Sequence, residues 1–236
     1  MPKYYSISYS AFGIDVHAAL IDYYGSSNIN IVSQSDTSVE FECPSITDVK
    51  IKLTRHAAGF TAYANDMIFS STNSSFTSAK EYHLILADAF LLLDSIANNS
   101  LYSHSALIAR LSNGRYICCG GITCGTNSDS LRATNVCFFT DTMIVRPIRF
   151  PGLDIDASVD GRPAIIAAYP VDNVEVERNV DGTTAYVPEL YISAKKGNVF
   201  VGEDFYLSLA GLNGVTANGI YCDKQKYVYI KRETSV

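Results

Sequence analysis

Hydrophobic residues near the start of the chain recur at the spacing of a helix. Ile14, Ala18 and Ile21 lie three or four residues apart, and a glycine follows the last turn of the pattern. This spacing predicts a helix over residues 14–24, because such positions share one helix face. The alternating residues 3–8 that precede it predict a strand.

The pattern then changes to a period of two, which is typical of strands with one buried face. Residues 39–43 alternate apolar side chains with glutamates, and residues 49–53 alternate them with lysines. An antiparallel hairpin that places Phe41 opposite Ile51 puts the apolar side chains on one face, whereas a shift by one residue spoils both faces. On the other face this register predicts two ion pairs, Glu40 with Lys52 and Glu42 with Lys50.

Residues 78–97 fit two different structures. Ser78 and Glu81 match the capping box that begins a helix. Residues 84–87 and 90–96 also have the lengths of two buried strands. Hydrophobic periodicity does not separate a short buried helix from buried strands. We favour two strands, because the segments on both sides have the β pattern.

The second half of the chain consists of short alternating segments separated by turn residues. The pair Asn113–Gly114 is typical of a β-hairpin, and several later prolines disrupt long helices. The predicted strands cover residues 106–111, 115–119, 136–139, 143–145, 164–169, 174–176, 190–193, 205–209 and 227–231. We therefore predict an α+β protein dominated by antiparallel β-sheet, with one short N-terminal helix and a β-rich C-terminal half. A polar break at residues 98–100 divides it into an α+β domain, 1–99, and a β-rich domain, 100–236.

The charge of the chain limits the classes of partner that we expect it to bind. Its 236 residues include 24 acidic and 18 basic side chains, for a net charge of −6. Lysine and arginine do not cluster, so we expect no nucleic-acid partner, whose phosphates would need them. The most apolar segment, 84–96, contains two aspartates and is short for a membrane span, and the first residues lack the pattern of a secretory signal. We expect no membrane partner and synthesis in a cytoplasm.

The six cysteines are the strongest candidates for catalytic or metal-binding residues. They lie at positions 43, 118, 119, 124, 137 and 222. Structural zinc usually takes ligands in closely spaced pairs, and the chain has no Cys-x-x-Cys pair, so we predict no metal site. A catalytic thiolate needs a histidine beside it, and Cys118 or Cys119 with His104 or His83 are the candidates. Most of the cysteines lie in apolar runs, where a buried thiol acts as a small hydrophobic group. We adopt that interpretation and keep a cysteine-dependent enzyme as an alternative.

Two acidic motifs match known functional sites only in part. Residues 154–161 begin like a calcium loop, but Val159 occupies the glycine position and Ile165 the position of the closing glutamate. Glu40 and Glu42 have the spacing of a carboxylate pair as in glycosidases, but the facing lysines account for them better. No glycine-rich phosphate loop occurs. We predict no catalytic residue, no cofactor-binding residue, no cofactor and no enzyme activity.

The high tyrosine content is the remaining feature of the composition that bears on function. The chain has 16 tyrosines, and several crowd its two ends: Tyr4, Tyr5, Tyr9, Tyr23, Tyr24, Tyr221, Tyr227 and Tyr229. Aromatic side chains bury a large area with few rotatable bonds, which suits both protein–protein contacts and sugar stacking. A carbohydrate-binding β-domain therefore stays open as a second alternative.

Several segments follow one another in a recognisable order. They are Tyr23–Gly25, Lys52–Arg55 leading to Gly59–Phe60, Tyr82–Leu93, Gly120–Gly121, and Gly161–Pro163 before a β-rich end. This layout resembles virion structural proteins of tailed bacteriophages, of the tail and baseplate kind.

The resemblance implies a non-enzymatic building block that binds other virion proteins and copies of itself. It implies no cofactor and no active-site residue, and it implies localisation in the virion after synthesis in the host bacterial cytoplasm. Subunits that close into rings meet through two different patches. We expect strands 3–8 and 227–231 to be sheet edges that supply these patches.

Overall fold

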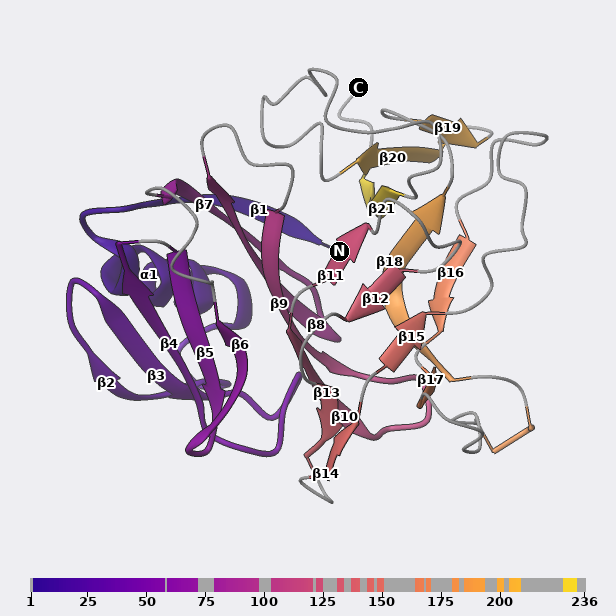
Figure 1. Ribbon diagram of the computed structural model, residues 1–236, viewed down its shortest axis with the longest axis horizontal. Helices are drawn as coiled ribbons and strands as arrows, with labels where there is room; N and C mark the ends of the chain where they lie inside the picture. Colours follow the sequence, from indigo (N-terminus) through magenta and orange to yellow (C-terminus); the bar gives the residue numbers. More distant parts are fainter. Residues whose placement is uncertain are drawn as a thin grey trace.

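The computed structural model of the protein consists of short antiparallel strands and a helix near the N-terminus (Figure 1). The structure describes residues 2–57, 59–71, 79–97, 103–120, 122–124, 131–133, 137–140, 144–146, 148–150, 164–167, 169–170, 180–182, 185–193, 199–201, 204–208 and 227–232. Among these residues the only helix is α1 (Phe12–Tyr24).

The described strands are β1 (Lys3–Ser8), β2 (Asn30–Gln34), β3 (Ser38–Glu42), β4 (Ile51–His56), β5 (Gly59–Ala64), β6 (Met67–Ser71), β7 (Ala79–Leu86), β8 (Phe90–Ala97), β9 (Ser103–Arg110), β10 (Tyr116–Gly120), β11 (Ile122–Cys124), β12 (Leu131–Ala133), β13 (Cys137–Phe139), β14 (Ile144–Arg146), β15 (Ile148–Phe150), β16 (Ala164–Ala167), β17 (Tyr169–Pro170), β18 (Tyr186–Ser193), β19 (Val199–Val201), β20 (Asp204–Ser208) and β21 (Tyr227–Arg232).

These strands form four sheets, in which every described pair is antiparallel. A seven-stranded sheet has the order β1-β7-β8-β9-β10-β13-β14, and a five-stranded sheet has the order β2-β3-β4-β5-β6. Later residues supply a second five-stranded sheet, β16-β18-β21-β20-β19, and a four-stranded sheet, β11-β12-β15-β17. The predicted fold class is confirmed, because the protein is α+β and dominated by antiparallel β-sheet.

The main described core lies between the seven-stranded sheet and the five-stranded sheet of β2–β6. Helix α1 contacts β1 and β7 of the first sheet and β2, β3 and β4 of the second, so it closes the side of this layer. Its buried side chains meet those of both sheets in one cluster that includes Phe12, Val16, Leu20, Val39, Phe41, Leu53, Leu84, Leu93, Ile108 and Cys118. The positions that predicted the helix are not its buried face, because Ile14 and Ala18 are exposed and only Ile21 packs partly against the core.

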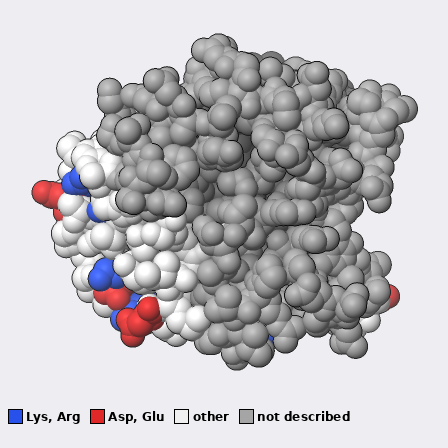
Figure 2. Space-filling model, in the orientation of Figure 1, with Lys and Arg blue, Asp and Glu red and all other residues white. Residues whose placement is uncertain are grey.

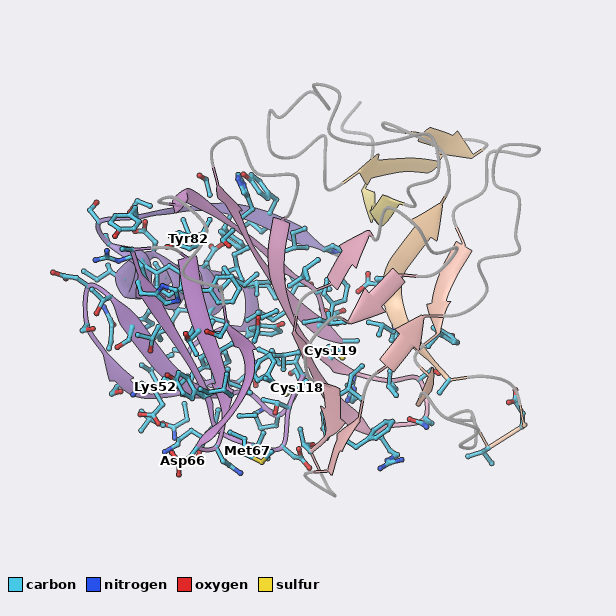
Figure 3. All side chains as sticks on the ribbon, viewed as in Figure 1. Lys52, Asp66, Met67, Tyr82, Cys118 and Cys119 are labelled. Atoms are coloured by element: carbon cyan, nitrogen blue, oxygen red, sulfur yellow. The ribbon has the colours of Figure 1, made fainter. Side chains whose placement is uncertain are left out.

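Tyr82 joins the two sheets within this core (Figure 3). Its side chain is fully buried, and its ring lies 4.9 Å from that of Phe12 and 6.3 Å from that of Phe60. Its hydroxyl donates a hydrogen bond of 2.8 Å to the carbonyl oxygen of Gly59 on β5. A buried hydroxyl needs such a partner, so the contact fixes how β7 lies over β5.

Helix α1 begins at Phe12, two residues before the predicted start at residue 14. Phe12 is fully buried, and the N–H of Gly13 donates to the carbonyl oxygen of Asp36 at 3.1 Å. A Cβ atom at Gly13 would lie 2.2 Å from the carbonyl oxygens of Ser35 and Ser38. The first turn of the helix therefore rests on the β2–β3 connection, a tertiary contact that helical periodicity does not reveal.

Residues 79–97 form two strands, as we favoured over a helix. β7 and β8 pair in antiparallel register, with Leu84 opposite Leu93. The hydroxyl of Tyr24, at the end of α1, donates to the carbonyl oxygens of Ala87 at 2.8 Å and Phe90 at 3.3 Å. The helix end therefore holds the connection between the two strands.

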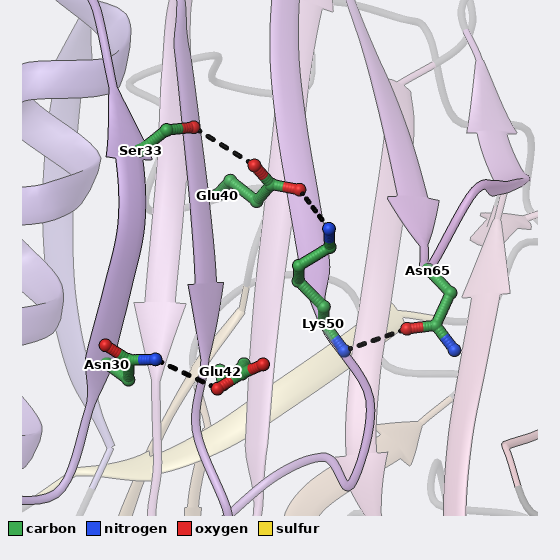
Figure 4. A network of polar contacts seen from close by, with 6 residues as sticks. All are labelled: Asn30, Ser33, Glu40, Glu42, Lys50 and Asn65. Carbon is green, nitrogen blue, oxygen red and sulfur yellow. Dashed lines mark hydrogen bonds and ion pairs between the residues drawn. The ribbon is translucent and has the colours of Figure 1, made fainter.

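The predicted register of the hairpin is confirmed, but its ion pairs are not (Figure 4). Phe41 lies opposite Ile51 and Glu40 lies opposite Lys52, yet the Glu40 carboxylate pairs with Lys50 at 2.8 Å. The second oxygen of Glu40 accepts from Ser33 at 3.1 Å, and Glu42 accepts from Asn30 Nδ2 at 3.0 Å. The neighbouring strand β2 supplies these donors, and a hairpin considered alone omits it.

The proposed division at residues 99 and 100 falls within 98–102, outside the described residues. The strands on either side of it, β8 and β9, pair along their length, with Leu92 opposite Leu107. The division therefore does not separate two sheets. A polar break in the apolar pattern marks a connection between neighbouring strands as readily as a domain boundary.

The expected edge position is correct for one terminal strand and wrong for the other. β1 is the outermost strand of the seven-stranded sheet, whereas β21 lies between β18 and β20. Position near the end of a chain does not determine position in a sheet, because later strands can insert between earlier ones. The expected strand 174–176 and the acidic motif 154–161 lie outside the described residues.

Candidate functional site

The structure places the candidate cysteines in the centre of the molecule (Figure 3). Cys118 and Cys119 are adjacent on β10 and both are fully buried. Cys118 belongs to the core between the seven-stranded sheet and the five-stranded sheet of β2–β6. Cys119 lies on the other face of its sheet, because successive residues of a strand point to opposite faces.

The histidines proposed as partners of these thiols occupy distant positions in the sheet. Cys118 lies opposite Ile108 of β9, and His104 is four residues further along that strand, which corresponds to about 13 Å. His83 lies on β7, and β8 and β9 separate β7 from β10. The backbone register therefore does not bring either histidine beside Cys118.

Burial also opposes a reactive thiol at Cys118. Desolvation raises the pKa of this thiol well above its ordinary value, and the neighbouring Cys119 acts in the same direction. A raised pKa lowers the fraction of thiolate, which is the nucleophilic form. Cys118 therefore acts as a hydrophobic core residue at neutral pH.

The described residues hold no group of three or more His, Cys, Asp or Glu side chains that could bind a metal ion. Glu40 and Glu42, considered above as a carboxylate pair, lie in the polar network on the outer face of the hairpin (Figure 4). The ion pair with Lys50 lowers the pKa of Glu40. A general acid requires a raised pKa, so the structure gives Glu40 the opposite property.

The surface that stands out is the outer edge of the seven-stranded sheet. We call it the β1 edge and define it as residues Lys3–Ser8 with Asp15 and Asp22 of α1. No described strand pairs with β1 on the side away from β7. Lys3, Ser6 and Ser8 are exposed, while Tyr4 and Tyr5 are half-buried. The edge therefore presents backbone groups together with parts of two aromatic rings.

Asp22 organises the beginning of the β1 edge. Its carboxylate forms an ion pair with Lys3 and accepts a hydrogen bond of 2.7 Å from the Tyr5 hydroxyl. The ammonium group of Lys3 also lies 5.2 Å from the centre of the Tyr5 ring. Hydrogen bonds from Lys3 and Tyr5 lower the pKa of Asp22. The pKa of Tyr5 is raised, mainly by burial and also by its hydrogen bond to Asp22. Asp22 is therefore ionised and Tyr5 protonated at neutral pH.

Tyr4 is fixed on the other face of the same strand. Its ring stacks on that of His83, with centroids 5.7 Å apart and planes at 16°. Its hydroxyl lies 2.5 Å from Nδ1 of His83, which is buried in β7. Both tyrosines of β1 are thus held in place before any partner binds, which reduces the entropy lost on association.

Asp15 of α1 shows which backbone groups of β1 point outwards. The Ser8 N–H donates to the Asp15 carboxylate at 2.8 Å, so it points away from β7. Backbone N–H groups alternate between the two sides of a strand. The Ser6 N–H therefore also points away from β7, toward the position of an added strand.

Charges of both signs lie side by side on the described part of the face in Figure 2. This arrangement matches the sequence, in which lysine and arginine do not cluster. Within the described part of the chain, no helix has the length and apolar character that a membrane span requires.

Comparisons with protein-family models, with curated proteins and with solved structures find no match for this chain. Alternation predicted the strand at residues 3–8, and its edge position was expected from the resemblance to ring-forming virion subunits, whereas the contributions of Asp15, Asp22 and His83 were not predicted. Asp15 and Asp22 belong to α1, and His83 belongs to β7. No local sequence motif connects these residues to β1. Only the packing of α1 and β7 against β1 brings them together.

Proposed function

We propose that this chain is a non-enzymatic structural subunit of a tailed-phage virion, of the tail or baseplate kind, which acts through protein–protein assembly. The observation that carries the proposal is the edge of β1 away from β7, with which no described strand pairs, together with two tyrosines held in fixed positions. An exposed edge strand is a template for pairing with another strand, and tyrosine is enriched in protein interfaces. The segment order that resembles phage virion proteins supports the class of particle.

The occupant of the β1 edge in this proposal is the β1 strand of a second copy. Lys3 lies at the start of the strand, and Asp15 is bonded to Ser8 at its end. Antiparallel pairing of two copies places the Lys3 end of each strand beside the Asp15 end of the other. Because both copies use the same edge, this pairing is isologous and closes as a dimer. The tyrosines then lie near its centre.

Proline at position 6 tests this edge. Ser6→Pro removes an N–H that points away from β7, so the seven-stranded sheet is retained, since edge strands tolerate proline on the solvent side. We expect the native protein to be a dimer in size-exclusion chromatography with light scattering, and Ser6→Pro to be a folded monomer. Ser6→Ala keeps the N–H and is the matched control, which should remain a dimer. A dimer that persists in folded Ser6→Pro would exclude the β1 edge as the contact.

The virion assignment has its own test. We expect tryptic peptides of this chain in density-purified phage particles from infected cells that express it. Their presence only in the cell lysate, with the particles free of them, would contradict a structural role in the virion.

A further inference from the structure

Two cysteines far apart in sequence occupy facing positions in the seven-stranded sheet. β10 and β13 are antiparallel neighbours, and their register places Cys119 directly opposite Cys137. The Cα atoms of directly opposed residues lie about 4.5–5.5 Å apart in such pairs, within the range that a disulfide spans. We propose that Cys119 and Cys137 form a cross-strand disulfide when the protein meets an oxidising environment.

The neighbouring positions make this pair specific. Cys118, next to Cys119 and equally buried, lies opposite Ile108 on one side and Phe138 on the other. On its second side Cys119 lies opposite Leu107. Cys137 is therefore the only cysteine that the described register places opposite Cys119, and Cys118 has a phenylalanine at the equivalent place.

The reaction needs an oxidant, for which a low-molecular-weight disulfide such as oxidised glutathione is sufficient. One thiolate attacks a sulfur of oxidised glutathione and releases one reduced glutathione. The second thiolate then attacks the mixed disulfide, so that the protein disulfide forms and a second reduced glutathione leaves. Two thiol protons pass to water or to the departing thiolates. The protein loses two electrons and the oxidised glutathione gains them.

The redox conditions of the compartment determine whether the two cysteines are present as thiols or as a disulfide. In a bacterial cytoplasm, reducing systems keep the two thiols reduced, which agrees with Cys119 being free in the structure. A protein released from the cell meets oxidising conditions. Cys119 is fully buried, so oxidation requires local opening or takes place during folding. The bond would then join β10 to β13 across residues 120–136 and restrict the unfolded chain.

Peptide mapping after refolding tests the pair without depending on access to the folded core. The full chain is unfolded and reduced, refolded in a glutathione redox buffer, blocked with an alkylating reagent and digested with trypsin. Cleavage after Arg115, Arg132 and Arg149 yields peptides 116–132 and 133–149, since Pro147 prevents cleavage after Arg146. We expect these peptides to be joined by a bond that dithiothreitol releases, with the loss of two hydrogen atoms from the intact mass.

Single substitutions assign the bond, because peptide 116–132 contains three cysteines. Cys118→Ser and Cys124→Ser should retain the linked peptides, whereas Cys119→Ser should lose them. Cys119→Ala is a second variant in case serine disturbs the core, and circular dichroism confirms that each variant folds. The oxidised native protein should melt about 5 °C or more above the reduced form, and the Cys119 variants should show no such difference. Linked peptides in folded Cys119→Ser, or none in the native protein, would overturn the proposal.

Discussion

Single residues in this structure are constrained most where backbone segments approach closely. Gly13 lies in the first turn of α1, where a Cβ atom would lie 2.2 Å from two backbone carbonyl oxygens. Gly120 is similar, since its Cβ would lie 1.9 Å from the carbonyl oxygen of Phe69 on β6. The structure shows that β10 and β6 cross there without room for a side chain.

Gly13→Ala distinguishes close approach from helix propensity by the sign of its effect. Propensity alone predicts that alanine stabilises the helix by about 1 kcal/mol. The structure predicts that the free energy of unfolding falls by about 1–3 kcal/mol, because the β2–β3 connection must shift. Urea denaturation measures the difference. Ala18→Gly, at an exposed position of α1, calibrates propensity and should cost about 1 kcal/mol. A stabilised Gly13→Ala would contradict the packing of α1.

Glu40 makes stability depend on pH in the acid range. Its pKa is lowered by the hydrogen bond from Lys50, so the unfolded chain binds more protons than the folded one. The contribution of Glu40 is complete above the ordinary glutamate pKa and is lost as the pH falls through the lowered value. Glu40→Gln should therefore flatten the acid side of a plot of unfolding free energy against pH. Lys50→Gln should have the same effect, and a slope unchanged in both variants would contradict the ion pair.

Among the elements, β3 and β4 were predicted together with their register, because each has one buried face and one exposed face. β3 and β4 alternate clearly, and their register followed from that alternation. β5 was not predicted as a strand, because five of its six residues are buried and alternation disappears when both faces are covered. The alternation also did not determine which lysine Glu40 contacts. Lys52 lies 6.0 Å from the Tyr63 ring, whereas Lys50 reaches the carboxylate diagonally.

The end of α1 is joined to the β7–β8 connection through one of two adjacent tyrosines. Tyr24→Phe removes the donor to the carbonyl oxygens of Ala87 and Phe90 in a buried place. We expect the free energy of unfolding to fall by about 1–2 kcal/mol, because buried carbonyl groups lose their partner. Tyr23→Phe is the control, since its hydroxyl bonds Asp88 at the surface, and it should change stability by less than about 0.5 kcal/mol. Equal effects in chemical denaturation would contradict the buried anchor.

At the scale of the whole molecule, local patterns predicted the class of the fold but not its topology. The α+β class and the antiparallel pairing follow from alternation and turn residues, which are local. The insertion of β21 between β18 and β20, and the sheet shared across residue 99, depend on contacts between distant segments. Removal of residues 227–236 would remove an internal strand of a sheet. Such a truncation disrupts the fold, so it does not test assembly at an edge.

We propose that this protein acts by associating through the β1 edge. Native mass spectrometry of the purified, non-denatured chain over a dilution series tests it most directly. We expect a species of twice the 25.8 kDa chain mass, without added metal mass, that dissociates to a monomer on dilution and is absent from Ser6→Pro. A native chain that stays monomeric at every concentration, or a dimer unchanged by Ser6→Pro, would contradict the account.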